Sequence, residues 1–552
     1  MNFREEIRLA VDISLNVLRE KPVKYQIEHP ADMSHGDYSV NVALVVGGGR
    51  PLAEKIAENL KKSDLNKIAS EISVAGPGFI NISIRNEALI TLIDKLLRAE
   101  YLGVSGKGKK VIVEYSSPNI AKPFTVGHLR STIIGDAIAN ILESIGWTVL
   151  RDNHLGDWGT QFGKQICALK KWGDVNRLDY SVKELVDLYV KFHEEAEKDP
   201  KLEDEARSWF KKLEDGDKEA RALWQKCVDW SWIEFNKIYQ RLGIKFSDQF
   251  NQGRGLGESF FEDKMTDVIA ELKAKKLLKT GEDGAQLVFF KDEKYPPAMI
   301  LKKDGATLYA TRDLATDKYR KEKYNPDLVI NEVGQEQELY FKQLFEIETR
   351  LGWYKKEQRI HVAHGMYRFK EGKMSTRKGN VIWLEEVLDE AEKKATAKEI
   401  AIGALKWNDL KGSAKRDIVF DWDEILNMEG NSGPYLQYTY ARCRSVIAKS
   451  NSQIDPERSR KTTDLTNPDG LVLRTLYRFD EVVTQAAEEL SPSLVANFLY
   501  DLAQRYNNFY NVETILKAPV GKKEFRLWLT HATAEILKKG LYLLGIEVPS
   551  RM

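Results

Sequence analysis

The sequence predicts an α/β protein whose central domain contains a parallel β-sheet. Residues 110–115 (KVIVEY) form a β-branched run typical of a buried strand, and apolar residues then recur at helical spacing from Leu129 to Ile145. Residues 147–150 begin a second strand, so this segment is one β–loop–α–β unit with parallel strands. The loop therefore opens at the carboxyl end of a strand, where open α/β sheets bind their ligands.

The rest of the chain predicts two further domains and one insertion. Residues 1–100 mix amphipathic helices with the alternating strand 79–84 (FINISI), which is typical of a small α+β domain. Residues 101–428 would form a Rossmann-like parallel-sheet domain. Within it, the stretch from about 172 to 234 is rich in Lys, Glu and Asp at helical spacing, which predicts a helical insertion. Residues 429–552 predict an all-α bundle.

Composition narrows the class of protein. The 84 basic and 83 acidic residues nearly balance, so bulk charge does not indicate a polyanionic partner, although a local basic face remains compatible with it. Cys167, Cys227 and Cys443 lie far apart and lack metal-ligand spacing, which predicts buried thiols in a reducing compartment and no structural metal. The acidic start is typical of neither a signal nor a transit peptide, and no run of 18 apolar residues occurs. We therefore expect a cytoplasmic protein that does not contact membranes.

The loop and helix start of the β–loop–α–β unit carry the string SPNIAKPFTVGHLRST. Gly127 permits close backbone approach, and His128 falls in the first helical turn, where free N–H groups and the helix dipole favour phosphate. A glycine–histidine pair alone would indicate only an ordinary helix start. The whole string resembles the first nucleotide-binding motif of class I aminoacyl-tRNA synthetases, and among them most closely the arginyl-tRNA synthetases. Thr125 replaces the family's histidine; its hydroxyl can hydrogen-bond phosphate or ribose but carries no charge.

A second motif is the glycine-flanked basic loop at residues 372–379 (GKMSTRKG). It resembles the mobile KMSKS loop of the same class, in the KMSTR form that many arginyl enzymes show, with Thr376 in place of the final lysine. Such a loop can close over ATP phosphates and stabilise their transition-state charge; by itself it would indicate a basic surface loop. The resemblance implies that ATP is bound by Thr125, Gly127, His128, Gly365, Met366, Lys373, Met374, Ser375 and Arg377. It also implies catalytic roles for His128 and Lys373, with Lys122 as a supplementary phosphate ligand.

Polar residues outside these motifs match the family's arginine pocket. The resemblance implies that arginine is held by Asn119, Glu258, Tyr309, Asp313 and Gln337. A guanidinium has five fixed donors and a permanent charge, so a selective site needs carboxylates in its plane and a ring or apolar face above it. Each residue alone is more often a surface or capping residue. The glycine-rich loop at residues 154–164 (HLGDWGTQFGK) matches the family's active-site wall.

Candidate RNA contacts lie at both ends of the chain. Phe79 and Asn81 lie on one face of their predicted strand and offer a ring and an amide, which suit an unstacked nucleotide. Residues 38–46 are expected to form another strand of the same domain. The resemblance implies that this domain contacts the D-loop corner of tRNA and that the bundle binds the anticodon, with Tyr506 and Asn507 as candidates. Packing roles remain the alternative for both.

The resemblance covers nearly the whole chain and implies ATP-dependent ligation of L-arginine to tRNA(Arg) through an arginyl-adenylate. It implies ATP with Mg²⁺ carried by the nucleotide, a monomeric enzyme, and arginine activation only after tRNA binds. Three alternatives remain. A catalytically dead tRNA-binding relative would explain Thr125. A nucleotidyltransferase for a small molecule would not need the flanking domains, and a synthetase for another amino acid would not need the arginine-pocket set.

Overall fold

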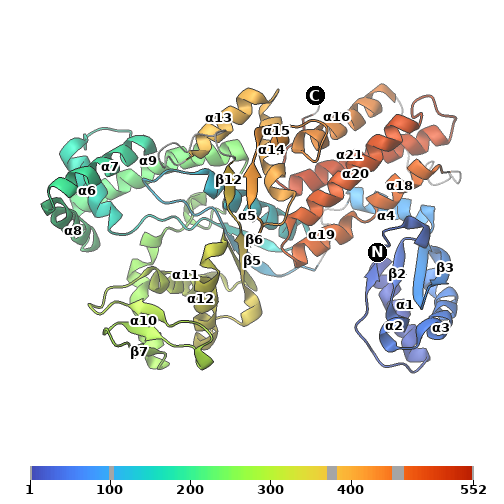
Figure 1. The fold of residues 1–552 in the computed structure, drawn as a ribbon, viewed down its shortest axis with the longest axis horizontal. Helices are drawn as coiled ribbons and strands as arrows, with labels where there is room; N and C mark the ends of the chain where they lie inside the picture. Colours follow the sequence, from blue (N-terminus) through green and yellow to red (C-terminus); the bar gives the residue numbers. More distant parts are fainter. Residues whose placement is uncertain (1–2, 99–104, 370–381, 451–464, 550–552) are drawn as a thin grey trace.

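The computed structural model describes residues 3–98, 105–369, 382–450 and 465–549. Figure 1 shows a sheet-containing part in the centre with its helical insertion to the left, a helical bundle to the upper right, and an N-terminal unit below the bundle. The N-terminal unit packs through α4 (Asn86–Arg98) against the bundle helices α18 (Asn467–Leu476) and α21 (Lys522–Leu543). The predicted fold class is confirmed: a parallel sheet, a helical carboxyl-terminal region and a small α+β unit are all present.

The central sheet has four parallel strands in the order β11–β10–β5–β6. They are β5 (Lys110–Glu114), β6 (Thr148–Asp152), β10 (Leu328–Gly334) and β11 (Arg359–His364). The chain adds β6 on one side of β5 and later places β10 on its other side, so the connections diverge between β5 and β10. The carboxyl ends of these two strands therefore flank the crevice where such sheets bind ligands.

The helix α5 (Val126–Ser144) joins β5 to β6 and is buried along almost its whole length. It packs on the sheet and also touches α14 (Lys398–Leu410) and the bundle helices α19, α20 and α21. Because α5 is covered on several sides, its sequence is apolar around most of its circumference. The helix that begins at the predicted phosphate site is thus also a central packing element of the molecule.

The helical insertion is longer at both ends than the predicted stretch. It comprises α6 (Gln161–Trp172), α7 (Val182–Lys198), α8 (Lys201–Glu214) and α9 (Lys218–Leu242). The chain then returns through η4 (Glu258–Lys264), α10 (Met265–Ala274), the antiparallel strands β7 (Leu278–Thr280), β8 (Gln286–Val288) and β9 (Ala298–Leu301), α11 (Tyr309–Tyr324), η6 (Gln335–Gln337) and α12 (Glu338–Leu351). This second set of elements forms the lower-left part of Figure 1.

The carboxyl-terminal half begins with elements that bridge the sheet and the bundle. Strands β12 (Tyr367–Phe369) and β13 (Ile418–Phe420) pair in parallel beside α13 (Leu384–Lys394), α14 and α15 (Trp422–Ile425). The bundle helices are α16 (Gly433–Ser450), α18, α19 (Phe479–Glu488), α20 (Pro492–Val512) and α21. Leucines, tyrosines and tryptophans of these helices form one continuous core with α5 and the N-terminal unit.

The N-terminal unit is an antiparallel sheet, in the order β1–β2–β4–β3, covered by helices. Its elements are α1 (Phe3–Val17), β1 (Ile27–Glu28), β2 (Tyr38–Val40), α2 (Val42–Val46), α3 (Gly49–Lys62), β3 (Ala69–Ala75), β4 (Phe79–Ile84) and α4. The expected strand at 38–46 was wrong beyond Val40. Val42 and Ala43 are buried in a short helix that packs on α3 and ends at Gly47, whose φ is +85°. Tertiary packing here overrides the β-propensity of valine.

Candidate active site

The start of α5 presents a neutral imidazole. Thr125 is the residue before the first turn, and its backbone N–H donates to His128 Nδ1 at 3.0 Å. Burial lowers the pKa of His128 to about 4, so the ring is uncharged near neutral pH. Because Nδ1 accepts, the ring proton is assigned to Nε2, which can then donate to a ligand. The Thr125 hydroxyl also lies 3.0 Å from Nδ1, so it contacts the ring directly.

The loop at Gly365 is tied to the same helix. Arg130 of α5 is buried, and its Nη1 donates to the Gly365 and Arg416 carbonyls at 2.8 Å each. A Cβ atom on Gly365 would lie 2.7 Å from the carbonyl carbon of Arg416, so a larger residue would displace this loop. Met366 follows and is 56% exposed. The structure therefore holds Gly365 and Met366, two of the predicted ATP-binding residues, close to the helix that begins at the predicted phosphate site.

Of the other residues predicted to bind ATP, the structure describes Lys122 but not those of the KMSTR loop. Lys122 is exposed in the loop between β5 and α5. The KMSTR residues lie outside the described part of the chain; these are Lys373, Met374, Ser375, Thr376 and Arg377. Their contacts with ATP stay predictions.

All five residues predicted to hold arginine line one cavity of about 250 Å³. Asn119 follows β5, Glu258 opens η4, Tyr309 and Asp313 lie in the first turns of α11, and Gln337 ends η6 after β10. The cavity lies at the carboxyl edge of the sheet, at the crevice beside β5 and β10. Residues far apart in the sequence thus converge, since Asn119 and Gln337 share the cavity.

The cavity is acidic and has an aromatic wall. Burial raises the pKa values of both Glu258 and Asp313. The Tyr340 hydroxyl donates to Asp313 Oδ2, and Arg312 Nη1 lies 3.5 Å from Glu258 Oε2. Tyr309 is 60% exposed, with its ring 5.1 Å from that of Tyr340. These groups match the charge and the planar shape of a guanidinium.

A network of buried charges forms part of the cavity lining, through Glu114, Asp317 and Arg320. Arg320 donates to Asp152 Oδ2 at 2.6 Å and to Glu114. Arg359 donates to both carboxylate oxygens of Asp317, at 2.8 and 2.7 Å. This network joins β5, β6, α11 and β11, and it holds the floor of the cavity in place. Its acids already have arginine partners, which distinguishes them from Asp313 above.

Two residues in the loop at residues 154–164, His154 and Asp157, were not among those predicted to hold arginine. His154 lines the cavity, and its Nε2 lies 3.9 Å from Asp313 Oδ1. Asp157 accepts from the backbone N–H of Ser259 at 2.8 Å and from its hydroxyl at 2.7 Å, so it anchors the residue next to Glu258. Burial raises the pKa of Asp157 to about 6. The sequence feature that could have identified these two residues is the position of their loop, directly after the second strand of the parallel sheet.

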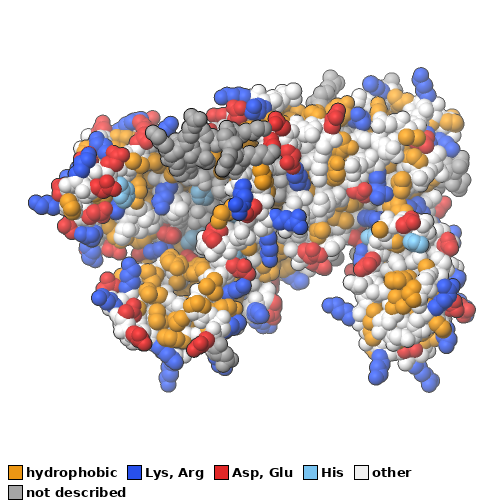
Figure 2. Space-filling model, in the orientation of Figure 1, with side chains coloured by type: hydrophobic (Ala, Val, Ile, Leu, Met, Phe, Trp, Pro, Cys, Tyr) orange, Lys and Arg blue, Asp and Glu red, His pale blue; other side chains and the backbone are white. Residues whose placement is uncertain are grey.

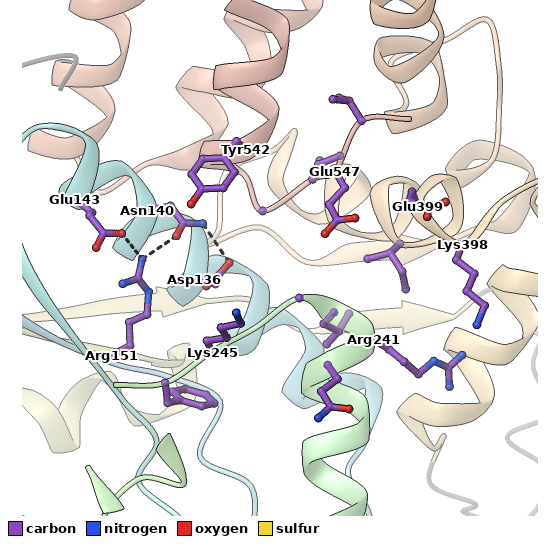
Figure 3. Close-up of a pocket in the computed structure, with 18 of the residues that line it drawn as sticks. Asp136, Asn140, Glu143, Arg151, Arg241, Lys245, Lys398, Glu399, Tyr542 and Glu547 are labelled. Carbon is purple, nitrogen blue, oxygen red and sulfur yellow. Dashed lines mark hydrogen bonds and ion pairs between the residues drawn. The ribbon is translucent and has the colours of Figure 1, made fainter. Parts of the chain in front are cut away.

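A larger cavity, of about 700 Å³, lies elsewhere and is lined by none of the predicted site residues. We call it the junction cavity because its walls come from α5 and β6, the end of α9, the start of α14, and the end of α21 with the segment after it. Figure 3 shows Arg151 pointing toward Glu143 and Asn140, with Nη2 distances of 2.9 and 2.8 Å. Arg241 pairs with Asp389 on α13. The junction cavity therefore marks where several parts of the molecule meet.

The N-terminal RNA candidates differ in exposure. Phe79 is 39% exposed at the start of β4. Asn81 is only 7% exposed, and its Oδ1 accepts from the Ser39 hydroxyl at 2.9 Å. The expectation that both present their side chains to a nucleotide is corrected, because Asn81 is buried and bonds to Ser39 of the paired strand β2.

The bundle candidates are both interior residues. Tyr506 is fully buried, and Asn507 accepts from Arg442 Nη1 at 2.6 Å while its amide donates to Tyr435 and Thr439. Their expected role in direct anticodon contact is therefore corrected to packing and support. On the surface nearby, Arg442 lies 4.9 Å from the ring of Tyr438 and 4.8 Å from that of Tyr510. Those rings are 40% and 39% exposed, and we call these three residues the Tyr–Arg cluster.

Family models match most of the chain. Residues 92–399 match tRNA synthetases class I (R), catalytic domain; residues 436–552 match the DALR anticodon binding domain; residues 2–84 match the arginyl tRNA synthetase N terminal domain. Together with the parallel sheet and its ligand crevice, these matches define a class I aminoacyl-tRNA synthetase.

Whole-chain comparisons narrow the class. The arginine–tRNA ligase of Halothermothrix orenii is 40% identical and that of Clostridium perfringens is also 40% identical, covering 100% and 99% of both chains respectively. The structure of Thermus thermophilus arginyl-tRNA synthetase matches with a TM-score of 0.81 at 25% identity over 100% of both chains. That of the Plasmodium falciparum enzyme has the same fold, with a TM-score of 0.84 at 24% identity over 99% of both chains. The chain belongs to the arginyl-tRNA synthetase family.

Proposed function

We propose that this chain ligates L-arginine to tRNA(Arg) at the expense of ATP, through an arginyl-adenylate intermediate. The observation that carries the proposal is the single cavity that brings together Glu258, Tyr309, Asp313, Gln337 and Asn119. It opens at the crevice of the sheet, and α5 begins its phosphate-binding turn at the end of the loop after β5. An acidic amino-acid pocket and a phosphate-binding helix start are the two halves that arginine activation requires.

The pocket would select arginine by charge and shape. Asp313 and Glu258 would accept the guanidinium donors, Tyr309 would cover its face, and Gln337 would add an amide contact. Asn119, at the sheet end, would hold the amine or carboxylate of the amino acid. Citrulline lacks the charge and would leave buried acids unpaired, at a cost of roughly 3–5 kcal/mol. Lysine would leave donor positions of the planar fork empty.

Activation would rely on positioning and charge neutralisation. The arginine carboxylate attacks the α-phosphorus of ATP, and pyrophosphate leaves. His128 would donate from Nε2 to phosphate without transferring a proton, held in place by Thr125, while Gly127 allows close approach of the backbone. Lys122 and Lys373 would balance the charge on the leaving pyrophosphate. The other ATP contacts that we propose are Gly365, Met366, Met374, Ser375 and Arg377.

Class I synthetases use ATP as a substrate, generally with Mg²⁺. Among the described residues no group of three or more His, Cys, Asp or Glu is arranged to hold a metal ion. We propose that Mg²⁺ enters bound to the ATP phosphates, because this ion is usually held by substrate phosphates and few protein ligands. Its chemistry there would be to neutralise phosphate charge.

The tRNA would contact both ends of the molecule. We propose Phe79 as a stacking ring for an unstacked nucleotide and the Tyr–Arg cluster as a contact for anticodon bases, since rings and guanidinium planes stack on bases.

The expectations of a monomer, of a cytoplasmic protein and of tRNA binding before arginine activation stay proposals. In the described part of the chain, no helix is long and apolar enough to cross a membrane.

The test is aminoacylation of an unfractionated tRNA pool with each of the twenty amino acids. We expect charging with arginine alone, and only when ATP is present. Retained tRNA binding without charging would instead favour a catalytically dead relative. Charging with another amino acid would contradict the proposed role of the acidic pocket.

A further inference from the structure

His154 occupies an unusual position in the arginine pocket. Its side chain is 13% exposed, and among the described residues neither ring nitrogen has a hydrogen-bond partner. Its Nε2 lies 3.9 Å from Asp313 Oδ1 of α11. The ring of Phe261 in η4 lies 5.8 Å away and offers no polar atom. A buried imidazole without hydrogen bonds is costly unless its charge or a ligand compensates it.

The charged groups around this ring come from every element that faces it. Glu114 lies at the end of β5, Glu258 opens η4, and Asp313 and Arg320 come from α11. Burial disfavours the charged ring and so does Arg320, but the carboxylates outweigh both and raise the pKa of His154 above 6.5. Arg320 already pairs with Glu114 and with Asp152 below the pocket, so its charge is largely balanced there.

We propose that His154 carries a proton in the empty pocket, where it takes the place of the substrate cation, and that arginine binding releases this proton to solvent. The inference rests on the proposed function. Charge and atoms balance: the protonated ring and the arginine cation become a neutral ring, a bound arginine cation and one free proton. His154 would thus be a specificity-determining residue of the pocket.

The physical reason is competition between two cations for the same carboxylates. When a guanidinium binds Asp313 and Glu258, it removes the negative charge that stabilised the imidazolium and adds a positive charge beside it. A neutral ring then offers a nitrogen that can accept one of the five guanidinium N–H groups. A neutral analogue such as citrulline cannot displace the proton, so His154 adds to discrimination by charge.

Calorimetric titration of the full chain with L-arginine tests this directly. At pH 6.5, measured in two buffers of different ionisation enthalpy, we expect release of up to about one proton per arginine bound, and an affinity that rises with pH by up to about tenfold per unit. In His154→Gln both effects should vanish, whereas the exposed His35→Gln should retain them. Proton release that persists in His154→Gln would place the proton on a carboxyl group, Glu258, Asp313 or Asp157, and would overturn the proposal.

A second measurement uses the unaltered chain, so it does not depend on how the variant folds. We expect NMR of ring-labelled histidines to show one imidazole pKa that falls when arginine is added and stays unchanged with citrulline. Arginine binding without any such shift would refute the inference but leave the proposed function intact. No arginine binding at all, with or without tRNA, would contradict the proposed function itself.

Discussion

The arginine pocket and the junction cavity are both lined by charged side chains, but they balance those charges differently. In the junction cavity, Arg151 has Glu143 as its partner and Arg241 has Asp389, at 2.9 Å in each case. In the arginine pocket, Asp313 faces a tyrosine hydroxyl and His154, and among the described residues no lysine or arginine forms an ion pair with it. The junction cavity is the larger, about 700 against 250 Å³.

The difference shows that charge balance identifies the site better than size does. A paired ion has its partner already and mainly holds elements together. Among the described residues Asp313 has no lysine or arginine partner, and the imidazolium that we propose for His154 can be displaced, so this carboxylate is poised to bind a substrate cation. Figure 2 agrees that charged side chains of both signs are interspersed over the visible face, so surface charge alone would not have located the pocket.

The strongest test of the comparison is Asp313→Asn. Removing the charge partner of the guanidinium should cost about 2–5 kcal/mol, so kcat/KM for arginine should fall roughly 30- to 4000-fold. The KM for ATP should barely change. Steady-state aminoacylation measures both constants. Asp389→Asn, at the paired and 53% exposed site beside the junction cavity, is the matched control and should remain within about twofold of the unaltered chain. Equal losses in the two variants would remove the distinction between the cavities.

Lys406→Met, beside the junction cavity, is expected to lower the stability of the fold without changing the use of arginine. Lys406 is buried, and its Nζ donates to the Gly545 carbonyl after α21 at 2.5 Å, with Asp136 of α5 nearby. Its loss should lower the free energy of unfolding by about 3–5 kcal/mol, because it removes the cation beside the buried Asp136 carboxyl and leaves the Gly545 carbonyl without this donor. Urea denaturation and the KM for arginine are the readouts, and the KM should not move. Lys245→Met, on the wall of the same cavity, should leave both values unchanged; a shifted KM in Lys406→Met would show that the two cavities are coupled.

His128 is a predicted site residue that is buried in its uncharged form, so it should make the stability of the fold depend on pH. Its folded pKa is about 4, whereas in the unfolded chain it titrates near 6.5. Between these values the unfolded chain binds a proton that the folded chain does not, so His128 destabilises the fold as pH falls through this window, by about 1–2 kcal/mol between pH 7 and pH 5. Thermal unfolding of His128→Gln should therefore depend less steeply on pH than that of the unaltered chain. Parallel pH profiles would mean that the ring is protonated in the folded state.

The smallest effect is expected for Arg241→Gln. Arg241 is 24% exposed and pairs with Asp389 and Glu392, which are 53% and 20% exposed. Partly exposed pairs of this kind contribute about 0.5–1 kcal/mol, and salt screens them. The thermal midpoint should drop slightly at low salt and less at high salt, with arginine charging unchanged. A loss of charging would assign the end of α9 a role in the reaction.

Local patterns predicted much of this molecule. The β-branched run at residues 110–115, the turn rich in Ser, Pro and Asn after it and the helical spacing that follows predicted the β5–loop–α5 unit correctly. Local pattern failed at residues 42–46, where valines typical of a strand form α2 because their side chains pack on α3. It also failed for Tyr506 and Asn507, since helical spacing cannot tell a ring that meets RNA from one that meets the next helix.

The order of the elements follows from local patterns in the sequence, and the residue types of the arginine pocket follow from its resemblance to a family. Only the tertiary structure decided that Asn119, Glu258 and Gln337 open into one cavity, that Asn81 is buried beside Ser39 of β2, and that His154 has no hydrogen-bond partner among the described residues. The reason is physical. Burial and charge compensation depend on elements far apart in the chain, and their effect on a carboxylate or an imidazole exists only when those elements pack together.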